Sequence, residues 1–275
     1  MDFTSPVLTL DVKGHVATLW LDRPEARNAM GRALWEDLPK AAAAVEANDD
    51  VRVLIIAAKG PHFSVGLDLK EMGGTLTGGG GSHSKAKSNA TLYRNVRAMQ
   101  DAITCFENLR VPVIAATHGY VIGGAIDLIT ACDIRYASED AVFSVREAKV
   151  AIVADLGTLQ RLPRIVGPGH TAELAFTGKD ISAQRAGVIG LVNDVVPGSA
   201  DQVYAHAFAL AEEIAANSPL VVAGTKSVLA ANDGRTVAEG LDFVARWNTM
   251  YLQSNDLMEA MVAFMEKRAP TFKGD

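Results

Sequence analysis

Two short runs of apolar, largely β-branched residues constrain the fold more than any other feature of this chain. They are "VRVLIIAAKG" at 51–60 and "VPVIAATHG" at 111–119. A strand with one face in water alternates apolar and polar residues, whereas a solid apolar run indicates a strand buried on both faces. Because both faces of such a sheet must be covered, the two runs predict an α/β core.

The rest of the chain divides into recognisable segments. Residues 7–22 alternate around a glycine and predict a hairpin, 133–145 predict two short strands around a turn, and 33–49 predict a helix weakened or kinked at Pro39. The Gly/Ser-rich stretch 73–88 predicts a mobile loop before a helix at about 89–109. Beyond residue 200 only helical periodicity remains, so we expect a core at 1–200 and a helical region at 201–275.

Composition excludes several classes of protein. The chain of 275 residues is 49% hydrophobic and 21% charged, which is typical of a globular protein, and we find no apolar run long enough to span a membrane. The N-terminus resembles neither a signal nor a transit peptide, which predicts a cytoplasmic location. A net charge of −6 argues against nucleic-acid binding. Two cysteines and six scattered histidines predict neither disulfides nor a metal site.

Three acids lie in strongly apolar sequence. Glu147 and Asp155 are eight residues apart in "FSVREAKVAIVADLG", and Asp127 lies twenty residues before Glu147 in "IGGAIDLITACD". Carboxylates are rarely fully buried unless they are paired or take part in chemistry. The structural alternatives are a helix start for Asp127, an N-cap for Asp155 and, for Glu147, an ion pair with Arg146, Lys149 or Arg161.

Two glycine-containing turns follow the strand-like runs. They are "FSVGLDLKEM" at 63–72 and "GYVIGGAIDL" at 119–128. Glycine allows sharp turns and close approach of a ligand, and free N–H groups at a helix start favour negative charge. Two such groups aimed at one point form an oxyanion hole. The spacing alone is equally compatible with two tight turns that bind nothing.

These motifs, with "LGTLQRLPRIVG", "FTGKDISAQRAGVIGLVNDVVP" and "FMEKRAPTF", resemble the crotonase, or enoyl-CoA hydratase/isomerase, superfamily over nearly the whole chain. The resemblance implies an α/β spiral of ββα units with a C-terminal helical trimerisation region. It also implies a homotrimer or a homohexamer, with an acyl-CoA thioester as substrate. No cofactor is implied, because coenzyme A belongs to the substrate.

The resemblance also assigns the substrate contacts. It implies that the oxyanion N–H groups belong to Leu67 and Gly124, and that the loop from Val65 to Lys70 lines the CoA site. Family members usually have a small residue where this chain has Val65. Lys267 matches a family lysine that holds the nucleotide part of CoA, sometimes from a neighbouring subunit. The expected substrate and CoA contacts are therefore Val65, Gly66, Leu67, Asp68, Lys70, Gly124 and Lys267, with the Asp68 side chain itself expected to form a turn or cap.

The acids resemble the Δ3,5-Δ2,4-dienoyl-CoA isomerase branch of that superfamily. Hydratases have glutamates at the positions of Asp127 and Glu147, and typically a glycine at position 155. The shorter Asp127 reaches less far toward a water than a glutamate does. The resemblance implies that Glu147 removes a proton from C2 and Asp155 supplies one at C6, although sequence also allows the reverse. Asp127 is expected to tune or orient this pair.

Other functions compete with this interpretation. The first is a 2-enoyl-CoA hydratase or another acyl-CoA lyase or isomerase of the superfamily. The second is a non-catalytic scaffold or RNA-binding member, which the acidic balance disfavours. The third is a hydrolase with a serine nucleophile, but the chain contains no G-x-S-x-G motif.

Overall fold

The computed structural model describes residues 3–76 and 84–275, and it is built around a mixed six-stranded sheet. Its strands follow the order β1-β2-β3-β4-β6-β9. The first two form the antiparallel hairpin predicted from the alternating pattern, and every later neighbour is parallel. The strands of this sheet are β1 (Leu8–Lys13), β2 (Val16–Leu21), β3 (Val53–Ala58), β4 (Val113–Thr117), β6 (Ile134–Ser138) and β9 (Asp194–Val196).

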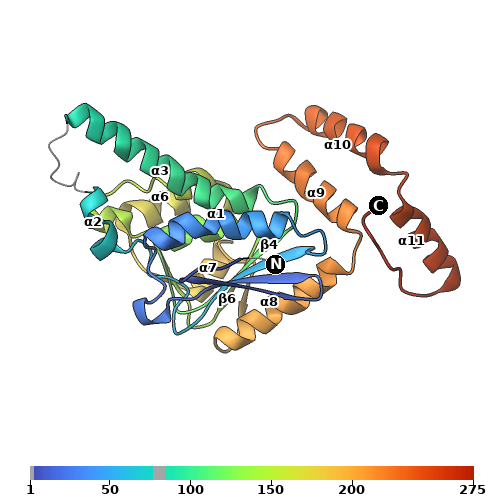
Figure 1. Cartoon of the computed structure of the whole chain (residues 1–275), viewed down its shortest axis with the longest axis horizontal. Coiled ribbons are helices and arrows are strands. Elements are labelled where there is room, and N and C mark those ends of the chain that lie inside the picture. The colour runs from blue at the N-terminus through green and yellow to red at the C-terminus, as the bar shows by residue number, and fades with distance from the viewer. Residues whose placement is uncertain (1–2, 77–83) are drawn as a thin grey trace.

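Helices cover both faces of this sheet, as the solid apolar runs predicted. Every residue of β3 and β4 is buried. Leu54 and Ile56 belong to the larger core, whereas Val53 and Ile55 alternate with them and pack in a second core with α8 (Ala200–Ala215). Figure 1 shows α8 on one side of the sheet, with α1 (Arg32–Glu46) and α3 (Lys85–Glu107) on the other. The predicted α/β class is confirmed.

A second, three-stranded sheet stacks beyond the end of β4. It contains β5 (Tyr120–Ile122), β7 (Val142–Ser144) and β8 (Ile181–Ser182). Short helices occupy the segments that connect the strands of the two sheets. These helices are η1 (Pro24–Ala26), α2 (Leu69–Leu76), α4 (Gly124–Thr130), η2 (Glu147–Val150), α5 (Thr158–Val166), α6 (Pro168–Thr177) and α7 (Ala183–Val188).

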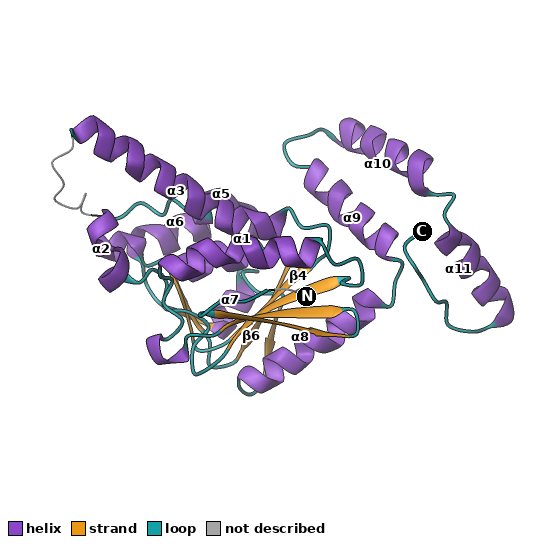
Figure 2. Cartoon of the chain, in the orientation of Figure 1, coloured by secondary structure: helices purple, strands orange, loops and turns teal. Residues whose placement is uncertain are grey.

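The last three helices form an arm that leaves this core. We define the arm as residues 219–275, with α9 (Pro219–Ala231), α10 (Val237–Tyr251) and α11 (Asn255–Glu266) (Figure 2). Lys226 ties it to the core by donating to the Val111 carbonyl at 2.9 Å and to Asp133 at 2.8 Å. Arg52 donates to the Phe272 carbonyl at 2.7 Å. The predicted boundary at residue 200 remains a prediction, and α8 immediately after it lies on the sheet.

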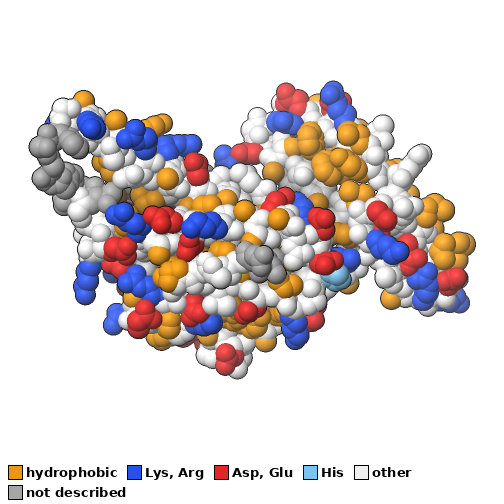
Figure 3. All heavy atoms as spheres, viewed as in Figure 1, with side chains coloured by type: hydrophobic (Ala, Val, Ile, Leu, Met, Phe, Trp, Pro, Cys, Tyr) orange, Lys and Arg blue, Asp and Glu red, His pale blue; other side chains and the backbone are white. Residues whose placement is uncertain are grey.

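Apolar side chains gather on the outside of the arm, as Figure 3 shows. Phe264 is 85% exposed and Met250 is 73% exposed. Other exposed apolar side chains of the arm are Val221, Leu229, Val237, Leu241, Leu252, Met258, Met261 and Met265. A surface this apolar is typical of an interface rather than of a solvated face.

One sequence expectation changed. The predicted loop at 73–88 is helical at both ends, because α2 continues to Leu76 and α3 begins at Lys85 under an N-cap from Ser84; residues 77–83 lie outside the described part. Helix α1 continues through Pro39 as a single element. Within the described residues no single helix is long and apolar enough to cross a membrane, and only the bent pair α8 and α9 passes that test together, by length and composition.

Candidate active site

The two glycine turns of the sequence lie side by side. Ser64 and Val121 form a parallel bridge, in which Ser64 N donates to the Tyr120 carbonyl at 2.9 Å and Ile122 N to the Ser64 carbonyl at 3.1 Å. Gly66 then turns with a φ of +81°. A Cβ at Gly66 would lie 2.5 Å from the Ile122 oxygen and 3.4 Å from the Gly124 nitrogen. The close approach and the left-handed φ both require glycine here.

Each turn leaves one peptide N–H free at this junction. Met30 N donates to the Gly66 carbonyl, and Asp68 N donates to the Met30 carbonyl. The N–H of Leu67, between Gly66 and Asp68, takes no part in this backbone pairing. Gly124 is the first residue of α4, where a helix has no internal acceptor for its N–H. Among the described residues neither N–H has a recorded acceptor. Two unpaired donors at adjacent turns fit an anionic oxygen.

A cavity of about 430 Å³ opens in front of these two groups. Its walls are mainly apolar and come from α2, α3 and the segment around η2. One face of α3 contributes Leu92, Val96 and Met99, at the spacing of helical turns. Every predicted acid lines the cavity, as do Val65, Gly66, Leu67 and Gly124. The structure thus brings together residues that are up to ninety positions apart in the chain.

Asp127 is the most deeply buried of the three acids. It is 1% exposed, and its Oδ1 accepts from the backbone N–H of Thr158 at 2.6 Å and from the Thr158 hydroxyl at 2.7 Å. Burial raises the pKa of Asp127 to about 7; the Thr158 hydroxyl opposes this shift, and the charges of Glu147 and Asp155 add to it. The expected bond to a helix start is present, at the start of α5.

Glu147 has no ion-pair partner among the residues that the structure describes. Arg146 pairs with Asp180, Arg161 pairs with Glu107, and no described ion pair includes Glu147 itself. Its Oε2 is buried without any hydrogen-bond partner among the described residues, while Oε1 would lie 3.2 Å from a Cβ at Gly123. Burial raises the pKa of Glu147, its own N–H opposes the shift, and the charge of Asp155 adds to it. An unsatisfied buried carboxyl oxygen is rare and points to a functional group.

Asp155 also lines the cavity, and it belongs to the irregular segment between η2 and α5. Asp155 as a whole is exposed in the isolated chain. Partial burial of its carboxyl group nevertheless raises the pKa of Asp155, and a hydrogen bond from its own backbone N–H opposes that shift. The expected N-cap role is not observed, because Gly157 occupies the N-cap position of α5. Among the described residues, the carboxyl groups of Glu147 and Asp155 therefore have raised pKa values and no recorded hydrogen bond or ion pair with another residue.

Comparison with known proteins identifies the family of this chain. The family described as enoyl-CoA hydratase/isomerase matches residues 11–275. The chain belongs to the enoyl-CoA hydratase/isomerase family. The predicted recognition from sequence motifs is confirmed.

Relatives within the enoyl-CoA hydratase/isomerase family share most of the chain. It is 44% identical, over 98% of its length and 96% of the relative's, to "Delta(3,5)-Delta(2,4)-dienoyl-CoA isomerase, peroxisomal" of Arabidopsis thaliana. It is 40% identical to the mitochondrial protein of the same name from Rattus norvegicus, over 92% and 77% of the two chains. The crystal structure of enoyl-CoA hydratase from Bacillus anthracis superposes with a TM-score of 0.88 at 32% identity, covering 98% and 100% of the chains. The crotonase-like fold is confirmed.

Three of the residues expected to contact CoA lie outside the cavity lining. Asp68 accepts from Arg23 at 3.0 Å and from the N–H groups of Lys70 and Glu71, so its side chain forms the expected cap, at the start of α2. The backbone N–H of Glu71 is the main cause of its lowered pKa. Lys70 is exposed on α2, and Lys267 ends α11 in the arm. Their contacts with CoA remain predictions.

The sequence analysis did not identify several residues that shape the cavity and its surroundings. Met30 and Trp35 lie under Gly124, where an added Cβ would meet the Met30 sulfur at 2.8 Å and the Trp35 ring at 3.7 Å. Trp35 is fixed by an indole N–H bond to the Met30 carbonyl at 3.1 Å. Thr158 was also missed, and its only signal was a hydroxyl residue next to Gly157. Among residues 3–76 and 84–275, no cluster of three His, Cys, Asp or Glu side chains is suited to a metal ion.

Proposed function

We propose that this chain is a dienoyl-CoA isomerase that converts a 3,5-dienoyl-CoA into a 2,4-dienoyl-CoA. The observation that carries the proposal is the pair Glu147 and Asp155, two unpaired acids with raised pKa values in one apolar cavity. The names of the Arabidopsis and rat relatives support the same reaction rather than hydration. A base and an acid at separate positions fit a proton transfer between two distant carbons.

The first step is removal of a proton from C2 by Glu147. The electron pair of the broken C–H bond enters the conjugated system and places negative charge on the thioester oxygen. The N–H groups of Leu67 and Gly124 are placed to stabilise that charge, and one such donor is worth about 3–4 kcal/mol. Because Glu147 Oε2 has no competing hydrogen-bond donor, it is free to accept this proton.

The second step is donation of a proton to C6 by Asp155. The electron pair of the dienolate forms the new C–H bond, and the remaining double bonds become the 2,4-diene. The raised pKa of Asp155 favours the protonated form that this step needs. One proton leaves C2 and one arrives at C6, so the reaction requires neither an oxidant nor an added cofactor. The opposite assignment, with Asp155 as base, uses the same two groups.

Asp127 has a supporting role in this proposal. Its Oδ1 is occupied by two hydrogen bonds from Thr158, so only Oδ2 is left to act on a water, and an aspartate reaches less far than the glutamate of a hydratase. The charges of Glu147 and Asp155 add to the raised pKa of Asp127, which is caused mainly by burial. This environment favours the isomerase over the hydratase alternative.

The reaction is tested with two substrates. We expect 3,5-octadienoyl-CoA to gain strong near-ultraviolet absorbance from conjugation, and crotonyl-CoA to lose its enoyl absorbance slowly or not at all. Asp155→Asn should abolish diene conversion while CoA binding, measured by calorimetry, persists. Rapid hydration of crotonyl-CoA without diene conversion would contradict the proposal, and a fully active Asp155→Asn variant would contradict the role of Asp155.

The arm supports an oligomer as part of the same proposal. Its exposed Phe264 and Met residues would be covered in the homotrimer or homohexamer expected from the family. Light scattering on the purified protein distinguishes monomer, trimer and hexamer. The cytoplasmic location stays a prediction, and the relatives' own names read peroxisomal and mitochondrial.

A further inference from the structure

The Asp155 carboxyl lacks a partner that would fix its direction. Its only recorded hydrogen bond is to its own backbone N–H, and residues 152–155 form neither helix nor strand. Gly157, two residues later, has a φ of +129°, a conformation other residues rarely adopt. The position of this carboxyl therefore depends on how the surrounding backbone is held.

One contact holds the backbone from α3. Gln100 Nε2 donates to the Asp155 carbonyl oxygen at 2.6 Å. The other end of the amide is also fixed, because Arg97 Nη1 donates to Gln100 Oε1 at 2.7 Å. A guanidinium can only donate, so it must face the amide oxygen, and the amide NH₂ must then point toward Asp155. Arg97 thus sets the orientation that Gln100 needs.

A second contact holds the backbone from α4. The Thr158 N–H and hydroxyl both donate to Asp127 Oδ1, three residues after Asp155. Thr158 is fully buried, and Asp127 is fixed in the first turn of α4, next to Gly124. The turn that carries Asp155 is consequently attached on one side to the acyl-pocket wall and on the other to the helix that supplies an oxyanion donor.

We propose that Gln100 and Thr158 are positioning residues that together place the Asp155 carboxyl at C6 of the bound acyl chain. This inference rests on the dienoyl-CoA isomerase function proposed above. Neither residue is assigned to the reacting atoms: Gln100 contacts the Asp155 backbone, and Thr158 acts through Asp127. A shift of about 1 Å in a reacting group can cost about 100-fold in rate.

We call the contacts of Gln100 and Thr158 the clamp. The proposal predicts that protonation at C6 depends on the clamp and that removal of the C2 proton does not. Glu147 belongs to η2 and lies against Gly123, and no recorded hydrogen bond joins it to Gln100 or Thr158. We therefore expect removal of the C2 proton to depend little on these two side chains. When the clamp is weakened, the dienolate should form at its usual rate and then return to C2 instead of receiving a proton at C6. In D₂O that return places deuterium at C2 of the unconverted 3,5-diene.

The test compares C2 deuteration, by NMR or mass spectrometry, with diene conversion, by absorbance, in Gln100→Leu and Thr158→Val. We expect conversion to fall roughly 10-fold in each, with KM unchanged and C2 deuteration maintained within about twofold. Thr158→Ser, which keeps the hydroxyl, should recover most of the conversion. Matched controls are Gln160→Leu, exposed on α5, and Thr171→Val, whose buried hydroxyl donates to the Gly167 carbonyl on α6. Both controls should convert the diene like the unaltered protein.

The outcomes separate this inference from the function on which it rests. If C2 deuteration and conversion fall in parallel, or if conversion is unchanged in both variants, the positioning role is wrong. If the unaltered protein converts no diene, the proposed function itself fails. Thermal unfolding of each variant identifies any that has not folded, and Gln100→Leu, at a half-buried surface position, keeps the test available if Thr158→Val is unstable.

Discussion

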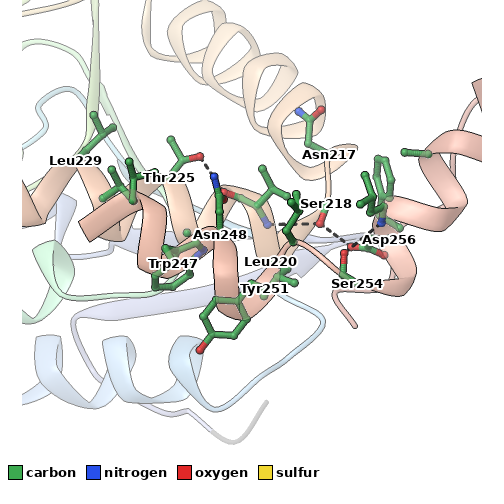
Figure 4. Close-up of a pocket in the computed structure, with 18 residues that line it drawn as sticks. Asn217, Ser218, Leu220, Thr225, Leu229, Trp247, Asn248, Tyr251, Ser254 and Asp256 are labelled. Carbon is green, nitrogen blue, oxygen red and sulfur yellow. Dashed lines mark hydrogen bonds between the residues drawn. The ribbon is translucent and has the colours of Figure 1, made fainter. Parts of the chain in front are cut away.

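The core and the arm each contain a cavity lined by an acid with a buried carboxyl oxygen, and the two acids differ in their hydrogen bonds. The arm cavity, about 520 Å³, lies between α9, α10 and α11 (Figure 4). Its Asp256 is 3% exposed and accepts from the Ser218 hydroxyl at 2.6 Å, Lys273 N at 2.8 Å and Gly274 N at 3.0 Å. Glu147 in the core cavity has one carboxyl oxygen with no donor.

This difference shows that burial alone does not identify a reacting acid. Each of the two carboxyl groups borders an apolar cavity of similar volume. Asp256 is saturated with donors that join the C-terminal tail to α9 and α11, so its function is to hold the arm together. Glu147 keeps an oxygen available to a substrate at the expense of an unsatisfied group. Asp127, with both of its hydrogen bonds on one oxygen, lies between these extremes.

The largest expected effect is on catalysis, at the acid without a partner. Glu147→Gln should lower the rate of diene conversion by about 1,000-fold, since general base catalysis contributes roughly 100- to 10,000-fold. Thermal unfolding should remain near that of the unaltered protein, because no recorded ion pair or donor from another residue is lost. The absorbance assay measures the rate of diene conversion, and calorimetry measures thermal unfolding. Glu36→Gln, exposed on α1, is the control. An equal loss of diene conversion in both variants would show that Glu147 has no special role in catalysis.

The intermediate effect is on the pH dependence of stability, at Asp127. Its pKa is about 7 in the folded protein against an ordinary value of 3.8, so the folded state binds the extra proton between these values. The stability that Asp127 contributes should therefore be fully present below about pH 4 and be lost as pH rises from about 4 to 7, by up to roughly 4 kcal/mol. Asp127→Asn should flatten that slope in urea unfolding measured at several pH values. An unchanged slope would mean that Asp127 is ionised in the folded protein.

The smallest expected effect is on folding, at the saturated acid of the arm. Asp256→Ala should lower the free energy of unfolding by about 3 kcal/mol, because it leaves buried donors without an acceptor. The rate of diene conversion per folded molecule should stay unchanged. Urea unfolding tests the first statement, and kinetics on the folded fraction tests the second. Asp242→Ala, which breaks only an exposed pair with Arg246 on α10, should cost less than about 1 kcal/mol.

Sequence revealed the parts of the site whose chemistry demands a residue type at a fixed spacing. The glycine turns and the three acids stood out because a sharp turn needs glycine and proton transfer needs carboxyl groups, and the resemblance to the family then assigned their roles. The buried strands β3 and β4 were found because their apolar runs are unbroken. These features are local, and each is visible within about thirty residues of chain.

The remainder depends on packing between distant segments. Gln100 and Asp155 are fifty-five positions apart, and nothing in either local sequence specifies that the α3 amide meets that carbonyl. Trp35 likewise reaches the site from α1 only because α1 covers the same sheet face as α3. Composition predicted a loop at Gly73 and Gly74, but both residues belong to α2. Glycine disfavours a helix, and the same helix buries the side chain of Met72. Tertiary contacts override local preference at these points.

The two free amides at Leu67 and Gly124 have an evolutionary consequence. Peptide groups are present whatever side chain a codon specifies, so a single substitution alters this part of the site only by bending the chain. The carboxyl groups around it are ordinary side chains, each replaceable by one nucleotide change or a few. Under the proposed function, a protein built in this way inherits enolate stabilisation with its backbone and is free to vary where protons enter and leave, so new acyl-CoA reactions can arise by exchanging acids around an unchanged anion site.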